Sequence, residues 1–161
     1  MTPQEYNKCV DLYADRVYRF IAKNTRNKDD AQDIVQNAFE ILWKNHLNVE
    51  YMKSRSYLFT VAYHNMIDQF RKRKNEADIT DEHNQVQGRS NQFTGAKDAL
   101  ELGLSRLPEM QKTAVLLRDY EGYSYEEIGQ ITGLNESQVK VYIFRARTAL
   151  KNFLVTQENA I

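Results

Sequence analysis

The chain has 161 residues, and its 22 basic and 22 acidic side chains balance to a formal net charge of zero. This length suits one medium domain or two small ones. Because the net charge is zero, it does not indicate an acidic or a basic partner; only a local cluster of charge could do so. A single cysteine and the lack of a long apolar run exclude a disulfide framework, a cysteine metal cage and a membrane span, so we expect a cytoplasmic protein without a signal peptide.

Apolar residues at helical spacing predict three helices in the first half of the chain. The first runs from about Tyr6 to Ile21, with Cys9 as a small core residue, and a polar loop follows at residues 25–30. The second has the clearest amphipathic pattern, and its inward positions are Ala31, Ile34, Val35, Ala38, Phe39 and Leu42. After a polar loop over residues 45–54, the third helix is expected over residues 56–74. No stretch alternates for long enough to predict a strand, so the predicted fold class is all-α.

The helical pattern fails after the third helix, in a polar stretch with few large apolar residues. Such a composition is typical of a flexible linker. Helical spacing resumes at Lys97. The predicted organisation is therefore two small helical domains, over residues 1–75 and 100–156, with a flexible linker over residues 76–99.

A helix-turn-helix is predicted near the end of the chain. Ser124 is a good N-cap for a short helix, and Glu127 three residues later completes a capping box. Gly133 can adopt the left-handed conformation that ends this helix, Leu134 suits a core position in the turn, and Asn135 can cap the next helix. The inward residues of that second helix are Val139, Ile143, Ala146, Leu150 and Leu154.

The outward face of the second helix carries polar, basic and apolar residues: Ser137, Gln138, Lys140, Val141, Phe144, Arg145 and Arg147. Gln and Ser can exchange hydrogen bonds with base edges, Lys and Arg can neutralise phosphates, and an exposed Phe144 can contact a thymine methyl group. Spacing alone leaves two interpretations open. The face binds DNA, or it belongs to an antiparallel helix pair whose basic side chains are simply solvated.

A second basic cluster, Arg71-Lys72-Arg73-Lys74, closes the third helix. Cations at a helix C-terminus also suit the macrodipole, which is a purely structural explanation. Aromatic and polar residues lie upstream on the same helix: Tyr57, Tyr63, His64 and Asn65. Aromatic rings interleaved with cations suit splayed single-stranded bases, so a functional interpretation stays open beside the structural one.

Three segments together resemble the extracytoplasmic-function sigma factors of bacterial RNA polymerase, a group of the sigma-70 family. Residues 29–45, DDAQDIVQNAFEILWKN, and residues 56–75, SYLFTVAYHNMIDQFRKRKN, are similar to region two of that family. Residues 104–154, which begin LSRLPEMQKTAVLLRDYEGYSYEE, are similar to region four. The match covers most of the chain in the expected order, and the three motifs together are highly specific.

The resemblance implies a protein that binds core RNA polymerase and directs promoter recognition and DNA melting. The second helix would dock on the clamp helices of the largest polymerase subunit through Asp33, Gln36 and Asn37. The third helix would read and hold open the −10 element through Tyr57, His64, Asn65, Asp68, Arg71, Lys72 and Arg73. The loop at residues 48–53 would capture a flipped base.

Region four would read the −35 duplex through the seven outward residues named above, and the polymerase flap is a further implied contact. The usual controller of the group is an anti-sigma factor, which is therefore an implied partner. The sequence departs from the family pattern at several positions. His64 stands where Asn is usual, Tyr57 stands where Trp is common, and Val141 and Tyr142 replace more polar residues. The promoter sequence is therefore expected to differ from that of better-known members.

A stand-alone helix-turn-helix regulator is the alternative, and it would bind duplex DNA tightly without polymerase. A scaffolding helical protein would leave both basic faces unexplained. An enzyme is not expected, because the sequence has no Gly-rich phosphate loop, no metal-ligand spacing among its three histidines and no nucleophile motif. Accordingly, we expect no catalytic residues, no bound metal or cofactor and no small-molecule substrate.

Overall fold

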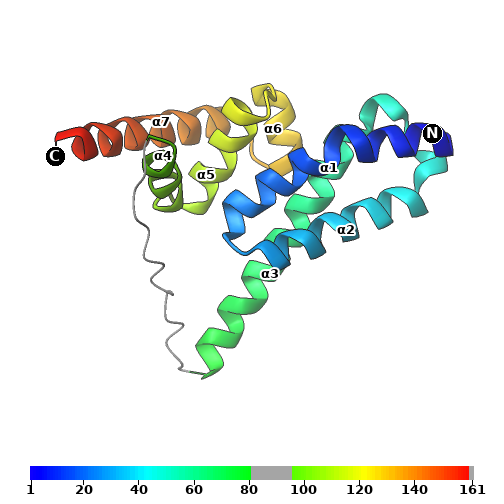
Figure 1. The fold of residues 1–161 in the computed structure, drawn as a ribbon, viewed down its shortest axis with the longest axis horizontal. Coiled ribbons are helices and arrows are strands. Elements are labelled where there is room, and N and C mark those ends of the chain that lie inside the picture. The colour runs from blue at the N-terminus through cyan, green and yellow to red at the C-terminus, as the bar shows by residue number, and fades with distance from the viewer. Residues whose placement is uncertain (81–95, 160–161) are drawn as a thin grey trace.

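In the computed structural model of this chain, the described residues are 1–80 and 96–159. They form helices joined by short turns, and no strand occurs among them, which confirms the predicted all-α class. The two ends of the chain lie far apart along the longest axis of the molecule (Figure 1). No helix among the described residues is both long enough and apolar enough to cross a lipid bilayer.

The first module comprises residues 1–80, and its three long helices pack on one another. These helices are α1 (Pro3–Thr25), α2 (Lys28–Lys44) and α3 (Ser54–Thr80). Two single 3₁₀ turns, η1 (His46–Asn48) and η2 (Tyr51–Lys53), occupy the connection between α2 and α3. Cys9 is fully buried, as expected, and its thiol donates a hydrogen bond to the Ser54 hydroxyl at 3.1 Å.

The connection between α1 and α2 is shorter than the loop expected over residues 25–30. Arg26 ends α1 in the left-handed region with φ 56°, and its N–H donates to the carbonyl of Ala22. Asn27 then caps α2, because its side-chain oxygen accepts a hydrogen bond from the N–H of Asp30 at 3.0 Å. Two adjacent caps thus replace the predicted loop, a compact arrangement that helical spacing alone does not specify.

The second module comprises residues 96–159. Its elements are α4 (Ala96–Ser105), α5 (Glu109–Val115), the π-helical turn η3 (Leu116–Tyr120), α6 (Tyr125–Thr132) and α7 (Glu136–Asn159). Helix α7 packs on α4, α5 and α6, so it is the central helix of this module. Most of the predicted linker, over residues 76–99, lies outside the described residues, although α3 continues to Thr80 and α4 begins at Ala96.

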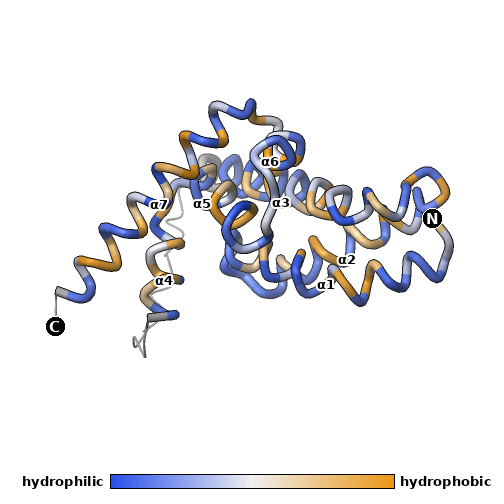
Figure 2. The backbone as a smooth tube through the Cα atoms, turned by 90° about the horizontal axis from the view of Figure 1, so that it is seen from above, coloured by the Kyte–Doolittle hydropathy of each residue, from blue (hydrophilic) through white to orange (hydrophobic). Residues whose placement is uncertain are grey.

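The buried apolar side chains of both modules belong to one hydrophobic cluster. Along α1, α2 and α7, hydrophobic and hydrophilic residues alternate at helical spacing (Figure 2), which fixes the side of each helix that faces this cluster. The modules touch directly: α3 packs against α6, and α1 packs against α4 and α5. The two predicted bodies are therefore docked, with α1 and α3 of the first module against the second.

Candidate nucleic-acid and polymerase interfaces

The helix-turn-helix has the capping that the sequence predicts. The Ser124 hydroxyl accepts from the N–H of Glu127 at 3.1 Å, and the Glu127 carboxylate accepts from the N–H of Ser124 at 2.9 Å. Gly133 ends α6 in the left-handed region with φ 82°, where a residue with a side chain would be strained. Leu134 is half-buried against the core. These contacts fix the angle at which α7 leaves the turn.

Gln138 has a structural task that the sequence analysis did not assign to it. Its side-chain oxygen accepts from the N–H of Asn135 at 3.0 Å, while the Asn135 side-chain oxygen accepts from the N–H of Gln138 at 2.8 Å. This reciprocal pair is a second capping box, at the start of α7. The Gln138 oxygen is thereby occupied, whereas its NH₂ group keeps two donors for an acceptor outside the protein.

The outward face of α7 is accessible along the segment expected to meet DNA. Val139, Ile143 and Ala146 are buried, so their neighbours on the helix point away from the core. The outward residues are all exposed: Ser137, Gln138, Lys140, Val141, Phe144, Arg145 and Arg147. Phe144 is 71% exposed and Val141 is 44% exposed, so two apolar side chains lie in the middle of a polar and basic face.

Some cations of this face are held by carboxylates within the module. Arg147 makes a two-pronged contact with Asp119 of η3, at 3.0 Å from Nε and 2.5 Å from Nη2. The hydrogen bond to Asp119 raises the pKa of the Arg147 guanidinium. Lys140 lies 3.5 Å from the Glu136 carboxylate and 5.6 Å from the centre of the Tyr125 ring. Arg147 is therefore anchored to the body of the module, at the edge of the face.

On α3, the residues expected to act at the −10 element are mostly accessible. His64, Asp68 and Arg71 are exposed, and their spacing of four and three residues places them on one side of the helix. Lys72 and Arg73 are exposed as well, and Arg73 forms an ion pair with Asp30 of α2. Tyr57 and Asn65, by contrast, form hydrogen bonds with residues of the connection after α2 and of α2 itself.

Tyr57 and Asn65 tie α3 to other parts of the first module. Tyr57 is half-buried, and its hydroxyl accepts from the Asn45 amide at 3.2 Å. The Asn65 amide donates to the side-chain oxygen of Asn37 at 2.9 Å, and both residues are half-buried. Asn37 was expected to contact polymerase and Asn65 to contact the −10 element. The structure therefore joins two residues that the sequence assigns to different partners.

The connection between α2 and α3 exposes two large apolar side chains that sequence reasoning missed. Leu47 on η1 is 82% exposed and Met52 on η2 is 87% exposed. Both lie in or beside the loop at residues 48–53 that was expected to capture a flipped base. Large apolar residues that fall outside any helical period, within an otherwise polar loop, were the available signal.

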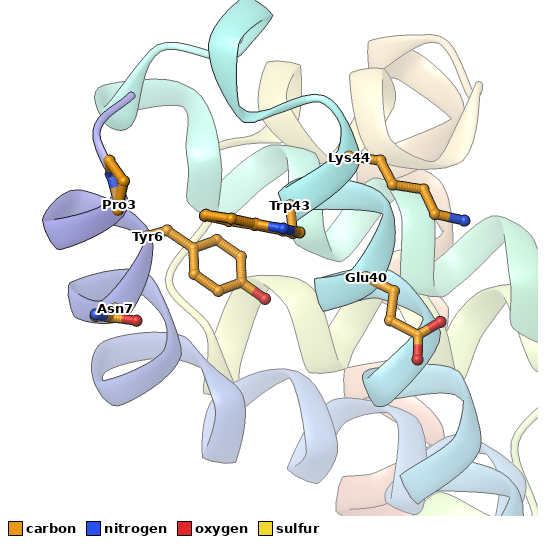
Figure 3. Close-up of a pocket in the computed structure, with 6 residues that line it drawn as sticks. All are labelled: Pro3, Tyr6, Asn7, Glu40, Trp43 and Lys44. Carbon is orange, nitrogen blue, oxygen red and sulfur yellow. The ribbon is translucent and has the colours of Figure 1, made fainter.

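The outward side of α2 holds the residues expected to contact polymerase. Asp33 and Gln36 are exposed, and the Gln36 amide donates to the Glu40 carboxylate at 3.5 Å. One turn further along, an open pocket of about 510 Å³ lies between the start of α1 and the end of α2. The Tyr6 and Trp43 rings meet edge to face there, with centroids 5.0 Å apart and an interplanar angle of 61°. Figure 3 shows the lining residues: Pro3, Tyr6, Asn7, Glu40, Trp43 and Lys44. The polar side of α2 thus continues into an aromatic patch.

Comparison with known proteins agrees with this division into two parts. Residues 9–76 match the family described as Sigma-70 region 2, and residues 97–150 match Sigma-70, region 4. The chain is 32% identical to the ECF RNA polymerase sigma factor SigM of Bacillus subtilis over 90% of this chain and 92% of SigM. It is 28% identical to the RNA polymerase sigma factor SigV of the same organism, over 93% and 91% of the two chains.

The fold also has a close counterpart among solved structures. The sigma factor RpoE of Bartonella quintana, solved in complex with the anti-sigma factor NepR, superposes with a TM-score of 0.79 at 25% sequence identity. The match covers 94% of this chain and 97% of RpoE, so it includes both modules. The matched family regions and the full-length relatives lead to one conclusion: the chain belongs to the extracytoplasmic-function RNA polymerase sigma factors of the sigma-70 family, which act in transcription initiation.

Proposed function

We propose that the protein initiates transcription through three separate surfaces, each on a different helix. The face of α2 attaches to core polymerase, the outward side of α3 acts on the −10 element, and the outward face of α7 reads the −35 duplex. The observation that carries this proposal is the exposure of Phe144 and Val141 among basic and amide side chains on α7, a helix capped by Asn135 and Gln138. A merely solvated basic face has no need of an exposed aromatic ring.

At the −35 element, α7 enters the major groove with its first turns. The free NH₂ group of Gln138 donates to a base acceptor, and Phe144 and Val141 pack on a thymine methyl group. Arg145 and Lys140 neutralise phosphates, and Ser137 adds a hydroxyl near the backbone. Arg147 helps to position α7 on the DNA and does not select a base, because Asp119 holds its guanidinium at the edge of the face.

At the −10 element, α3 holds DNA strands apart. His64, Asn65 and Asp68 offer hydrogen bonds to unpaired bases, and Arg71, Lys72 and Arg73 follow the phosphates. Tyr57, anchored by Asn45, offers a ring edge beside them. Extruding one base costs a few kcal/mol, and the exposed Leu47 and Met52 give such a base an apolar surface to lie against.

Attachment to core polymerase uses Asp33, Gln36 and Asn37, and the adjoining aromatic patch of Tyr6 and Trp43 extends that surface toward the end of α2. The partner is the pair of clamp helices in the largest subunit, with the flap meeting the second module. An anti-sigma factor is a further partner, by analogy with the complex in which RpoE was solved. The protein acts in the cytoplasm as a promoter-specificity subunit without catalytic activity of its own.

The test is reconstitution with sigma-free core polymerase on a pool of promoter fragments, followed by mapping of transcript starts. The expected result is a new, sequence-specific set of start sites that depends on the added chain. A gel shift with the purified chain alone separates the alternative. Tight, specific duplex binding without polymerase, together with no new start sites, would identify a stand-alone regulator instead.

A further inference from the structure

The first turn of α7 holds the side-chain amide of Gln138 in one orientation. Oε1 of this amide accepts a hydrogen bond from the backbone N–H of Asn135 at 3.0 Å. A backbone N–H can only donate, so the end of the amide that faces it is the oxygen and not the nitrogen. The NH₂ group is therefore the end that Gln138 presents to another molecule.

Asn135 makes this arrangement mutual. Its side-chain Oδ1 accepts from the backbone N–H of Gln138 at 2.8 Å, which closes the capping box. An unrestrained glutamine on a protein surface can turn its amide by half a rotation and offer either a donor or an acceptor. If Gln138 did so, the N–H of Asn135 would lose its acceptor at the moment when DNA excludes water from it.

Gln138 lies on the part of α7 that is proposed to enter the major groove. It is the third residue of the helix and is exposed, and the first residues of a recognition helix are those that contact base edges. Val141 lies one turn later on the same side and is 44% exposed. Arg145, a further turn along, is exposed as well. The oriented NH₂ group is thus in line with an apolar and a basic side chain of the same face.

An amide that only donates distinguishes between the two purines. Glutamine usually binds adenine through both ends of its amide, with the nitrogen donating to N7 and the oxygen accepting from the N6 amino group. The oxygen of Gln138 is already bonded to Asn135, so adenine would turn its amino group toward a second donor. Guanine presents N7 and O6, which are both acceptors, at the same edge.

We propose that Gln138 selects guanine in the −35 duplex, and that Asn135 is the positioning residue that enforces this choice. The inference rests on the proposed function, because it concerns the face of α7 assigned to the −35 element. Thymine is second in the expected order of bases, since it offers one acceptor, O4. Adenine and cytosine are last, since each directs an amino group at Gln138.

The variant Gln138→Glu separates the capping role from the reading role. Glutamate keeps a side-chain oxygen for the N–H of Asn135, so the capping box and the melting temperature are expected to be retained. The NH₂ group, however, is replaced by a second oxygen, which can only accept. This variant is therefore expected to prefer cytosine, whose N4 amino group donates to a carboxylate. Gln130→Glu, the same change at an exposed position on α6, is the matched control.

The measurement is transcription by core polymerase with the full chain on promoters whose −35 element is randomised. The position that Gln138 contacts is the one at which Gln138→Glu changes the order of bases. There the wild type is expected to favour guanine over adenine about tenfold, Gln138→Glu to favour cytosine, and Gln130→Glu to match wild type. An added negative charge weakens binding to every sequence alike, so it does not alter the order of bases.

Modified bases test the acceptor atoms directly. Placing 7-deazaguanine at the contacted position removes N7 and is expected to lower wild-type transcription about fivefold. Inosine keeps both N7 and O6 and is expected to leave it unchanged. Gln138→Glu is expected to show no loss with 7-deazaguanine. Equal losses with both analogues would place recognition in the minor groove and contradict the proposal.

The role of Asn135 is tested by the ratio of transcription from the guanine promoter to that from the adenine promoter. Asn135→Ala is expected to lower this ratio about threefold, because half of the capping box is lost and the Gln138 amide can turn. Asn135→Asp keeps the accepting oxygen and is expected to restore the ratio. A purely structural role would lower transcription from both promoters equally and leave the ratio unchanged, which would contradict positioning.

Two outcomes distinguish this inference from the function on which it rests. Promoter-directed transcripts in which adenine is favoured at the contacted position, or in which Gln138→Glu changes the order of bases nowhere, would overturn the inference alone. The absence of promoter-directed transcripts with the wild-type chain would overturn the proposed function and the inference together.

Discussion

Lys112 brings a charged amine into the contact between α1 and α5. The residue is 7% exposed, and its Nζ donates to the Asn24 carbonyl at 3.2 Å. Burial lowers the pKa of this amine, the nearby Arg26 lowers it further, and Glu109 opposes the shift. The amine therefore keeps its proton to a higher pH in the unfolded chain than in the folded one. Above about pH 10.5 Lys112 is neutral in both states and does not destabilise the fold; as the pH falls from there through the native pKa, the buried amine gains a proton and the free energy of unfolding decreases.

Replacing Lys112 with Met is therefore expected to stabilise the protein at pH 7 and to flatten its dependence on pH. The difference in free energy of unfolding between Lys112→Met and wild type should shrink as pH rises toward 10, because wild-type Lys112 then loses its proton. Urea unfolding at several pH values between 7 and 10 measures this. A difference that grows with pH would contradict the assignment.

Phe144 exposes an aromatic ring on the outward face of α7. Its replacement by Ala is expected to lower transcription from a −35-dependent promoter about tenfold, in line with about 1.5 kcal/mol for the loss of a large apolar contact. Thermal stability should not change, because the ring is 71% exposed. Thr148→Ala, an exposed change one helical turn further along α7, is the control. Equal transcription from both variants would remove Phe144 from the reading face.

Helical spacing predicted which residues of α7 point outward, because inward positions follow the period of the helix. It did not predict the partners Asp119 for Arg147, or Asn37 for Asn65. The sequence assigns Arg147, Asn65 and Asn37 to contacts with other molecules, whereas their pairing within the protein depends on how separate helices pack. Contact partners are therefore the part of the candidate sites that the sequence leaves open.

Among the elements, the helix-turn-helix depends on a close approach at Gly129. A methyl group at this position would lie 2.7 Å from the carbonyl oxygen of Leu134, which belongs to the turn. The capping of α6 and α7 was predictable, since Ser124, Glu127 and Asn135 are strong local signals. The close approach of Gly129 to the turn could not be predicted from the sequence, because it depends on the angle between two helices and no local sequence pattern encodes it.

The Gly129→Ala variant is expected to destabilise the protein by about 1–3 kcal/mol, the usual cost of forcing extra atoms into a packed site. The turn must shift to relieve the contact, so −35-dependent transcription should fall as well. Gln130→Ala, an exposed neighbour on the same helix, controls for helix propensity. Thermal melts followed by circular dichroism measure both variants, and a Gly129→Ala variant as stable as wild type would show that the turn adapts freely.

For the whole molecule, docking joins two bodies that the sequence predicts as separate. Glu121 and Tyr123 are far in sequence from Arg19 and Arg55, and no periodicity links them. The sequence therefore predicts two groups of helices but not the contacts that Glu121 and Tyr123 make with Arg19, Arg55 and Phe59. The shared hydrophobic cluster also has a thermodynamic consequence, because neither module can expose its docked surface without losing contacts of the other.

The wild-type chain is accordingly expected to unfold in a single calorimetric transition. Tyr123→Ala removes the ring that packs on Phe59 and should divide this transition into two, one for each module. Tyr142→Ala, which alters a half-buried tyrosine on α7 away from the contact between Tyr123 and Phe59, should lower the melting temperature without dividing the transition. Two transitions in the wild type would mean that the modules melt independently.

The short amide bridge between Asn37 and Asn65 limits how the protein can diversify. A substitution at either position removes this hydrogen bond, at a cost of about 0.5–1.5 kcal/mol, because water still reaches the remaining half-buried amide. Under the proposed function, in which Asn65 contacts the −10 element and Asn37 contacts polymerase, a change of base preference at position 65 requires a compensating change at position 37. The two proposed surfaces would then change together and not one at a time.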